Sequence, residues 1–281
     1  MKITLDLEKT IDQNANNYFS KAKDLRKKIT KIEETIQTFK KKQENFTKEE
    51  FESEYTKITS EKKHWFEKFK WSVTQEGFLL VAGRDATTNE ILIKKHTSPN
   101  DVVFHTDMAG SPFVVIKKEG DLPEEFGIPS EENIGEQSLQ DAAAFTAIHS
   151  RAWKMGLSTT EVFWVTPEQV SKEANSGESL SRGSFVIRGK TTYLHPNMDF
   201  VIGVRTEKEP ILLSGPRETI QKLCSIVIPI EQGKEKSSVV ARQIRKQCQE
   251  AKLDPEIDEI IRHLPSGGCQ VKKERKRKHN L

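Results

Sequence analysis

The sequence predicts a mixed α/β domain, of the α+β kind, preceded by an antiparallel helical hairpin or coiled coil. Two observations predict this class. An apolar seam with alternating steps of four and three residues runs through the first part of the chain, which is coiled-coil spacing. From Trp65 onward, short apolar strand candidates are interspersed with segments of helical spacing. The 281 residues suffice for one large domain or two small ones.

Residues 1–63 are expected to form the helical hairpin. A second seam of the same spacing runs from Phe51 to Trp65, with one polar break at Lys62. Thr47, with Glu50 three residues later, is a capping box that marks the start of the second helix. One long helix that pairs with another chain is the alternative. The first seam consists of Ile11, Ala15, Tyr18, Ala22, Leu25, Ile29, Ile32, Ile36 and Phe39.

Residues 64–268 are expected to form the α/β body. Residues 87–96 fit either a short helix, capped by Thr87 or Thr88, or a strand. A single helix is expected over residues 136–156, because its apolar positions follow helical spacing and Gly156 marks a C-terminal stop. Further helices are expected at 216–224 and 237–252, and strands on both sides of a turn at 76–77 and within 101–107, 111–118, 161–167, 198–206, 210–215 and 225–230.

Composition narrows the class of protein. The net charge is only +3, but residues 269–281 form a basic tail that is expected to be disordered, either as a solubilising segment or as a contact arm for nucleic acid. Three cysteines without Cys-x-x-Cys spacing argue against a disulfide framework or a zinc site. No apolar run approaches the roughly 20 residues that span a bilayer, and the first residues do not read as a signal peptide. We expect a soluble cytoplasmic protein with no metal, no cofactor and no membrane partner.

The stretch FHTDMAGS places His105 and Asp107 two residues apart at the end of a strand. In an extended segment both side chains project from one face, so they could act as a base and its orienting group. They could instead contact a ligand, with Ser111 and backbone amides binding a phosphate. A structural network in which His105 satisfies Asp107 is the third interpretation. The familiar phosphate-loop, dinucleotide, zinc-protease and serine-hydrolase signatures are absent.

The stretch AGRDATTNE combines a planar cation, a carboxylate and an amide near a helix start, in Arg84, Asp85 and Asn89. This combination is typical of an anion site. The alternative is an ion pair of Arg84 with Asp85 or Glu90, with Asn89 as a helix cap. The hypothesis of a binding site also includes Lys94 and Lys95, which close this segment.

The stretch SRGSFVIRGK carries a short apolar run between basic residues. Strand alternation sends Arg188 to one side and Phe185 to the other, and glycines at both ends allow close approach of another backbone. Exposed cations on such an edge suit a phosphate chain. An edge strand that charge protects against aggregation is the alternative. The candidate phosphate contacts are Lys172, Arg182, Arg188 and Lys190, with Ser184 as a hydrogen-bonding group.

Four segments, HWFEKFKWSVTQEGFLLVAGRDATTNE, FHTDMAGSPFVVIK, VFWVTPEQVSKEANSGESLSRGSFVIRGK and IIRHLPSGG, resemble the RNA-binding domain of the NFACT proteins. These proteins are ribosome-associated quality control factors that recognise large ribosomal subunits blocked by a stalled nascent chain. The resemblance runs in order from His64 to Gly268. Residues 3–28 are similar to the start of the family's coiled-coil arm. The resemblance implies an RNA-binding protein without enzymatic activity.

Full-length members of the family carry an N-terminal domain before the coiled coil, for which the printed sequence has no counterpart. We expect either a split factor whose N-terminal half is a separate subunit or a stand-alone RNA-binding module. The expected partners are RNA of the large ribosomal subunit, transfer RNA or both. Two alternatives from other classes are an enzyme on nucleotides or nucleic acids that uses His105 and Asp107, and a protein adaptor that acts through its coiled coil.

Overall fold

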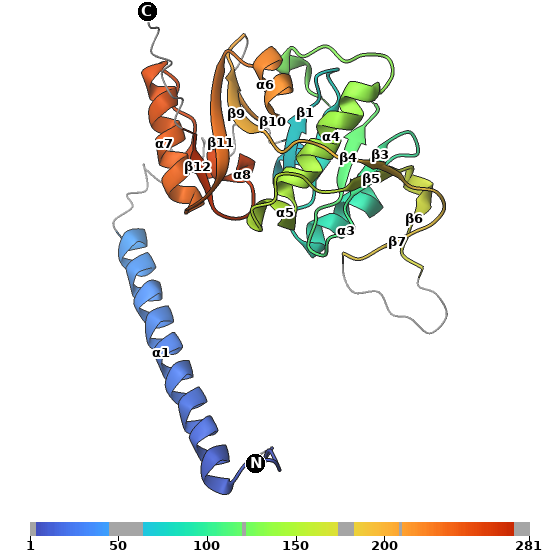
Figure 1. Ribbon diagram of the computed structural model, residues 1–281. Coiled ribbons are helices and arrows are strands. Elements are labelled where there is room, and N and C mark those ends of the chain that lie inside the picture. The colour runs from blue at the N-terminus through green and yellow to red at the C-terminus, as the bar shows by residue number, and fades with distance from the viewer. Residues whose placement is uncertain (1–3, 45–63, 120–121, 174–182, 208–209, 273–281) are drawn as a thin grey trace, which may run out of the picture. The chain divides into compact units, whose positions relative to one another are not determined.

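The computed structural model describes residues 4–44, 64–119, 122–173, 183–207 and 210–272 (Figure 1). The chain divides into two compact units, residues 1–63 and 64–281. The division falls at the boundary that the sequence predicts. A long helix occupies the first unit, and all the described strands lie in the second, so the predicted class of a helical arm followed by a mixed domain is confirmed.

Helix α1 spans Ile11–Glu44. A capping box begins it, because Gln13 N–H donates to Thr10 Oγ1 over 3.3 Å and Thr10 N–H donates to Gln13 Oε1 over 3.0 Å. Its predicted seam is exposed within the described part of this unit, with Leu25 and Ile32 both 58% accessible. The predicted second helix and its capping box fall in residues 45–63, outside the described residues, so the hairpin stays a prediction.

The body contains a six-stranded antiparallel sheet in the order β1-β2-β4-β3-β5-β8. A second antiparallel sheet has the order β10-β9-β11-β12. A two-stranded antiparallel ribbon, β6-β7, completes the described strands. The strands span Lys70–Val73 (β1), Leu79–Ala82 (β2), Val102–His105 (β3), Val114–Lys117 (β4), Val162–Val165 (β5), Val170–Ser171 (β6), Val186–Ile187 (β7), Thr192–Leu194 (β8), Phe200–Arg205 (β9), Ile211–Pro216 (β10), Ile226–Glu235 (β11) and Cys269–Val271 (β12).

Helices cover both faces of the larger sheet, which explains why β2 and β4 are buried along their whole length. On β2, Leu80 joins the core that contains α4, whereas Leu79 joins the core that contains Leu92 of α3. This two-sided burial produces apolar runs instead of strict alternation. The helices span Ala86–Lys95 (α3), Glu136–His149 (α4), Arg151–Lys154 (α5), Arg217–Leu223 (α6), Ser237–Glu250 (α7) and Ile257–His263 (α8), with 3-10 turns at Trp65–Lys68 (η1), Glu124–Phe126 (η2) and Pro167–Gln169 (η3).

Two helix predictions need correction. Residues 86–95 form a helix, but its N-cap is Asp85, whose carboxylate accepts from Thr88 N–H over 2.8 Å, and neither predicted threonine is the cap. The helix predicted over 136–156 is interrupted at Ser150, which has extended backbone angles and accepts from Ala152 N–H over 3.0 Å. Gly156 follows the second helix with φ +76°, as a C-terminal stop requires.

The predicted start of the disordered tail at residue 269 is wrong. Residues 269–271 form β12, which pairs with β11 at the edge of the second sheet. Cys269 of this strand is buried in the core. Residues 273–281 lie outside the described part of the chain. No helix among the described residues is long and apolar enough to span a bilayer.

Candidate nucleic-acid interface

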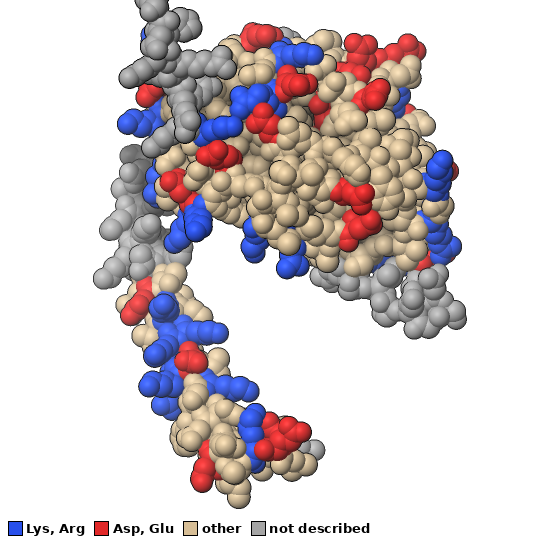
Figure 2. Space-filling model, in the orientation of Figure 1, with Lys and Arg blue, Asp and Glu red and all other residues tan. Residues whose placement is uncertain are grey.

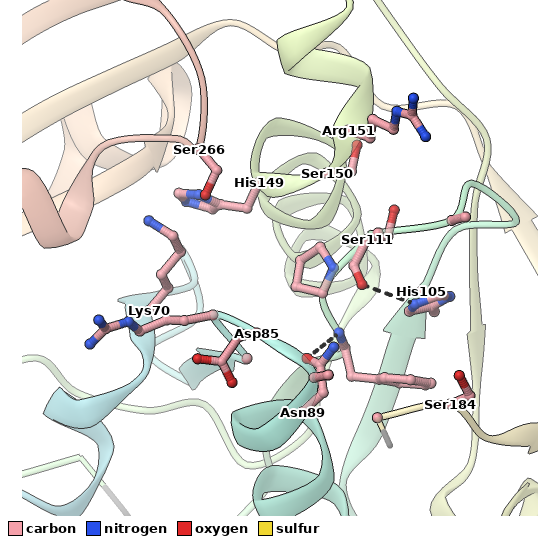
Figure 3. A pocket seen from close by; sticks show the side chains of 18 of the residues that line it. Lys70, Asp85, Asn89, His105, Ser111, His149, Ser150, Arg151, Ser184 and Ser266 are labelled. Carbon is pink, nitrogen blue, oxygen red and sulfur yellow. Dashed lines mark hydrogen bonds between the residues drawn. The ribbon is translucent and has the colours of Figure 1, made fainter. Parts of the chain in front are cut away.

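A pocket of about 880 Å³ opens where the ends of several body elements meet (Figure 3). One wall comes from the turn between β2 and α3 and from the loop between β3 and β4. The break between α4 and α5 forms a second wall, and residues 183–187 of the β6-β7 ribbon form a third. Lys70 of β1 and Ser266 also line the pocket.

Four cationic side chains line this pocket: Lys70, Arg84, Arg151 and Lys154. Among the described residues none of the four forms an ion pair. Asp85 is the carboxylate among the lining residues, and its Oδ1 is engaged by the start of α3. The lining therefore carries an excess of positive charge, which attracts anions.

Lys70 is the most deeply placed of these cations. Its ammonium donates to the carbonyl oxygens of Arg262 at 3.1 Å and Leu264 at 2.6 Å. An ammonium has three N–H donors, so one remains for another acceptor. Burial lowers the pKa of Lys70 to about 8, and the Arg84 guanidinium acts in the same direction. Lys70 is therefore mostly protonated at neutral pH, at a place where positive charge is poorly solvated.

His149 is the last residue of α4, next to the helix break. Its side chain is buried, and neither ring nitrogen has a hydrogen-bond partner. Burial holds the pKa of His149 well below its ordinary value, and the charge on Lys70 acts in the same direction. In Figure 3 the side chains of Lys70 and Ser266 point toward the imidazole, while Arg151 extends from the other side of the break. A neutral imidazole offers one donor and one acceptor.

An aromatic wall lies on the other side of the pocket. The ring of Phe113 stacks on His105, with centroids 4.2 Å apart, and meets Phe185 edge to face at 5.2 Å. Phe185 comes from the ribbon, and Lys172 Nζ lies 4.9 Å from its ring centroid. Ile187 of β7 also lines this side. Such a wall suits a flat, partly apolar ligand group.

The turn between β2 and α3 is held by Asn89. Asn89 Oδ1 accepts from Phe113 N–H over 3.1 Å (dashed line in Figure 3). A Cβ on Gly83 would lie 1.9 Å from that oxygen, so a larger residue would displace Asn89. The amide oxygen of Asn89 therefore joins the start of α3 to the β3–β4 loop within one pocket wall, and Asn89 is not a helix cap, in contrast to one alternative from the sequence.

The His105–Asp107 pair does not have the arrangement of a base and its orienting group. His105 Nε2 lies 3.2 Å from the carbonyl oxygen of Ser111, and Asp107 Oδ2 accepts from Tyr193 over 3.3 Å. No hydrogen bond joins the two side chains among the described residues. Burial lowers the pKa of His105, which lines the pocket, whereas Asp107 is exposed and is not a lining residue.

Residues 62–189 match a family model described as the NFACT protein RNA binding domain. The archaeal Rqc2 homolog aRqcH of Methanocaldococcus jannaschii is 42% identical over 221 residues, which cover 77% of this chain and 30% of that protein. The chain belongs to the NFACT family. The ribosome quality control complex subunit NEMF of Homo sapiens is 35% identical over 66% of this chain and 16% of its own length, and the Drosophila melanogaster homolog of that subunit is 31% identical over 72% and 20%. The chain thus spans less than a third of these relatives.

The structure sorts the candidate residues of this NFACT chain into two groups. Arg84, Asn89, His105 and Ser184 line the pocket. Outside it lie Lys94, Lys95, Asp107, Lys172, Arg188 and Lys190, and Arg182 is outside the described residues.

Two of the outer cations are engaged by Glu90 of α3. Its carboxylate accepts from Lys94 over 2.7 Å, from Gly183 N–H over 3.1 Å and from Lys172 over 3.4 Å. These contacts, that of Lys94 foremost, lower the pKa of Glu90 to about 2. Lys172 also donates to the carbonyl oxygen of Ser184 over 2.9 Å. Lys172 therefore attaches the ribbon to α3 and leaves little of its charge for a ligand.

The cations at the ribbon's outer end are more accessible. Arg188 is exposed and lies 3.9 Å from Glu173 in a loose ion pair, and the exposed Lys190 side chain has no hydrogen bond or ion pair among the described residues. On the face shown in Figure 2, acidic and basic groups are mixed, and basic side chains project from the edge of the body below α5 and α3. Excess positive charge is thus a local property of this NFACT body.

The sequence patterns do not mark Lys70, His149, Arg151 or Lys154 as site residues. Three of them meet only because α4 ends at His149 and α5 starts after Ser150, whereas the sequence predicts one continuous helix. A signal was available for Lys70: a lysine at the start of a strand flanked by aromatic residues can extend its ammonium beyond the apolar part.

Proposed function

We propose that this chain binds RNA through the pocket and its rim, and that it acts in ribosome quality control. The family match and the names of the relatives support this role. The observation that carries the proposal is the set of four cations that line one pocket of an RNA-binding family domain and form no ion pair within the described part of the chain. The proposed partners are RNA of the large ribosomal subunit, transfer RNA or both, and the proposed location is the ribosome in the cytoplasm.

Electrostatics gives this proposal its physical basis. Contacts from lysine and arginine to phosphates provide much of the affinity of RNA-binding proteins, because they release counterions from the nucleic acid. Arg84, Arg151 and Lys154 are exposed at the pocket, so phosphates can reach them without unfolding the body. Guanidinium groups in addition bind phosphate oxygens in a bidentate manner.

We propose binding rather than catalysis as the activity. Within the described residues, no three histidine, cysteine or acidic side chains gather in a way that could hold a metal ion. The His105 and Asp107 side chains are hydrogen-bonded to different groups, which favours binding over catalysis by this pair. Labelled RNA incubated with the protein and magnesium would test this point, because an enzyme would yield a changed product.

The test of the main proposal is a binding comparison of three proteins. Wild-type protein is expected to sediment with large ribosomal subunits and to retain labelled transfer RNA on a filter. The Arg84→Ala/Arg151→Ala variant is expected to bind at least one of these RNAs about 100-fold more weakly, since contacts to charged groups contribute about 1.5–3 kcal/mol each and two are lost.

A matched variant controls for loss of charge. Lys222→Ala/Lys246→Ala also removes two exposed cations, but neither lines the pocket. It is expected to bind like the wild type. Equal losses in both variants would attribute the binding to net charge alone, and unchanged binding in the pocket variant would refute the proposal.

The exposed seam of α1 favours a second candidate function, that of a protein adaptor. Leu25, Ile29 and Ile32 are each more than half exposed in the described part of the first unit. Exposed apolar stripes of this kind mark protein contacts. Leu25→Ser/Ile29→Ser would abolish ribosome association if the seam carries it, whereas the pocket variant would not. A separate N-terminal NFACT subunit stays a prediction, and copurification with this chain is its measurement.

A further inference from the structure

We propose that the pocket holds one nucleotide unit, with its phosphate beside Lys70 and His149 and its base against the half-buried Phe185, next to the buried ring of Phe113. This inference deepens the proposed RNA binding and rests on it. It identifies the unit of RNA that the pocket takes: a single residue turned out of its strand, instead of a stretch of backbone.

The size of the pocket agrees with a small ligand. Pockets that bind cofactors and similar molecules have volumes of about 300–1,000 Å³, and this one has about 880 Å³. A backbone groove alone would need only a row of cations along the surface. This pocket has depth, because Lys70, His149 and Ser266 lie behind the exposed rim residues and approach one another (Figure 3).

Two protein groups at the deep end of the pocket have hydrogen-bonding capacity that no other group among the described residues uses, and a ligand can fill it. The His149 side chain is only 5% exposed, and both of its ring nitrogens are without a partner. Buried polar atoms in folded proteins nearly always have partners. Lys70 has one N–H donor beyond its two bonds to backbone carbonyls. A phosphate between the two groups accepts from the ammonium and from one imidazole N–H.

The aromatic wall provides the place for a base. Bases stack on aromatic side chains without strong sequence preference, and this stacking is the common way in which proteins hold unpaired RNA residues. Phe113 is fixed by His105 on one ring face and by Asn89 at its backbone, so its position does not depend on the ligand. Phe185 meets it edge to face and comes from the ribbon. The pocket therefore has a polar end and an aromatic side, which match the two ends of a nucleotide.

Cations at the rim of the pocket can contact the RNA strand on both sides of the inserted nucleotide. Arg84, Arg151 and Lys154 are exposed around the pocket and form no ion pair among the described residues. They are placed to contact the phosphates on either side of the inserted residue. Asp85 would repel a phosphate, but its Oδ1 is directed to the Thr88 N–H at the start of α3. The same nucleotide chemistry also exists in free nucleotides, so the experiment must separate the two sources.

The experiment follows the imidazole signals of the protein by NMR with selectively labelled histidine. The probes are adenosine 5′-monophosphate, inorganic phosphate and a single-stranded RNA of ten residues. His149→Phe assigns the signal, because the phenyl ring replaces an imidazole that already packs against Phe145, 4.4 Å between centroids. Adenosine monophosphate and the RNA are both expected to shift the His149 signals and to compete for one site.

Two further variants test the rim and the aromatic wall, at the exposed Arg151 and the half-buried Phe185. Arg151→Ala is expected to weaken binding of the RNA about tenfold. Phe185→Leu is expected to weaken adenosine monophosphate about fivefold or more, because it removes base stacking. His149→Phe is expected to weaken both ligands while it raises the unfolding temperature without ligand. A purely structural histidine would give the opposite change in stability.

The outcomes separate this inference from the proposed function. Binding of inorganic phosphate as tight as that of adenosine monophosphate would overturn the inference, because the base would then add nothing. Absence of any shift at His149 would overturn it as well, and retained ribosome binding in the same preparation would leave the proposed function intact. Shifts with adenosine monophosphate alone would support a nucleotide site but would refute the RNA source.

Discussion

Removal of Arg151 and Lys154 is expected to halve the salt dependence of RNA binding. Both side chains line the pocket and are free of ion pairs among the described residues, as are Lys70 and Arg84. If each of the four contacts one phosphate of a single strand, the slope of log affinity against log salt is about −2.8, from about −0.7 per contact. A rise from about 50 to about 200 mM salt then weakens binding roughly 50-fold.

The Arg151→Ala/Lys154→Ala variant retains two of these contacts. Its slope is expected to be about −1.4, and the same rise in salt then weakens binding only about sevenfold. Filter binding of a labelled single-stranded RNA over a series of salt concentrations measures both slopes. The Lys222→Ala/Lys246→Ala variant, which loses the same charge away from the pocket, is expected to keep the wild-type slope.

Two results would refute this reasoning. An unchanged slope in the Arg151→Ala/Lys154→Ala variant, with lower affinity at every salt concentration, would show that these residues position the protein without contacting phosphates. A wild-type slope close to zero would exclude the phosphate contacts altogether. Circular dichroism of each variant controls for loss of the fold, and since both side chains are exposed we expect no change there.

Three further predictions concern pH and packing. Lys70 has a pKa of about 8, so it loses its charge and RNA affinity is expected to fall as pH rises through 8. A Lys70→Met variant that shows the same fall in affinity would contradict the assignment to Lys70. Burial lowers the pKa of His263 in the folded protein to about 3. Below the ordinary pKa of histidine, the imidazole therefore binds a proton in the unfolded state but not in the folded state. The free energy of unfolding is expected to decrease by about 2 kcal/mol between pH 7 and 5. Urea unfolding of wild type and His263→Gln at both pH values tests this, and equal losses would refute it. Gly83→Ala is expected to destabilise the protein by about 1–3 kcal/mol through its clash with Asn89, whereas Gly215→Ala, with its nearest contacts at 3.7 Å, is expected to cost less; equal unfolding temperatures would refute the clash.

Local sequence signals predict much of the fold. The seam of α1 follows from its apolar spacing, and the strands β5, β9 and β10 follow from short apolar runs with clear ends. The helix over residues 86–95 was ambiguous, since its short apolar run fits either period. Tertiary packing against the sheet decides that case.

The pocket was harder to predict, because it depends on a break inside one helical pattern. Residues 136–156 have continuous helical spacing, yet Ser150 adopts extended angles and its hydroxyl satisfies the start of α5. The break exposes Arg151 and ends α4 at the buried His149. No periodicity argument detects such a change of direction, because the apolar positions remain in phase on both sides.

The basic ribbon residues illustrate a further limit of composition. The position of Lys172 in a basic, glycine-rich stretch predicts a phosphate contact. In the structure the Glu90 carboxylate accepts hydrogen bonds from Lys172, from Lys94 and from the backbone N–H of Gly183. A Cβ on Gly183 would lie 2.6 Å from the backbone of residue 86, so the close approach of the ribbon to α3 requires glycine. The consequence is that Lys172 serves the ligand indirectly: with the ribbon fixed against α3, Phe185 is held against the aromatic wall, where a base can stack.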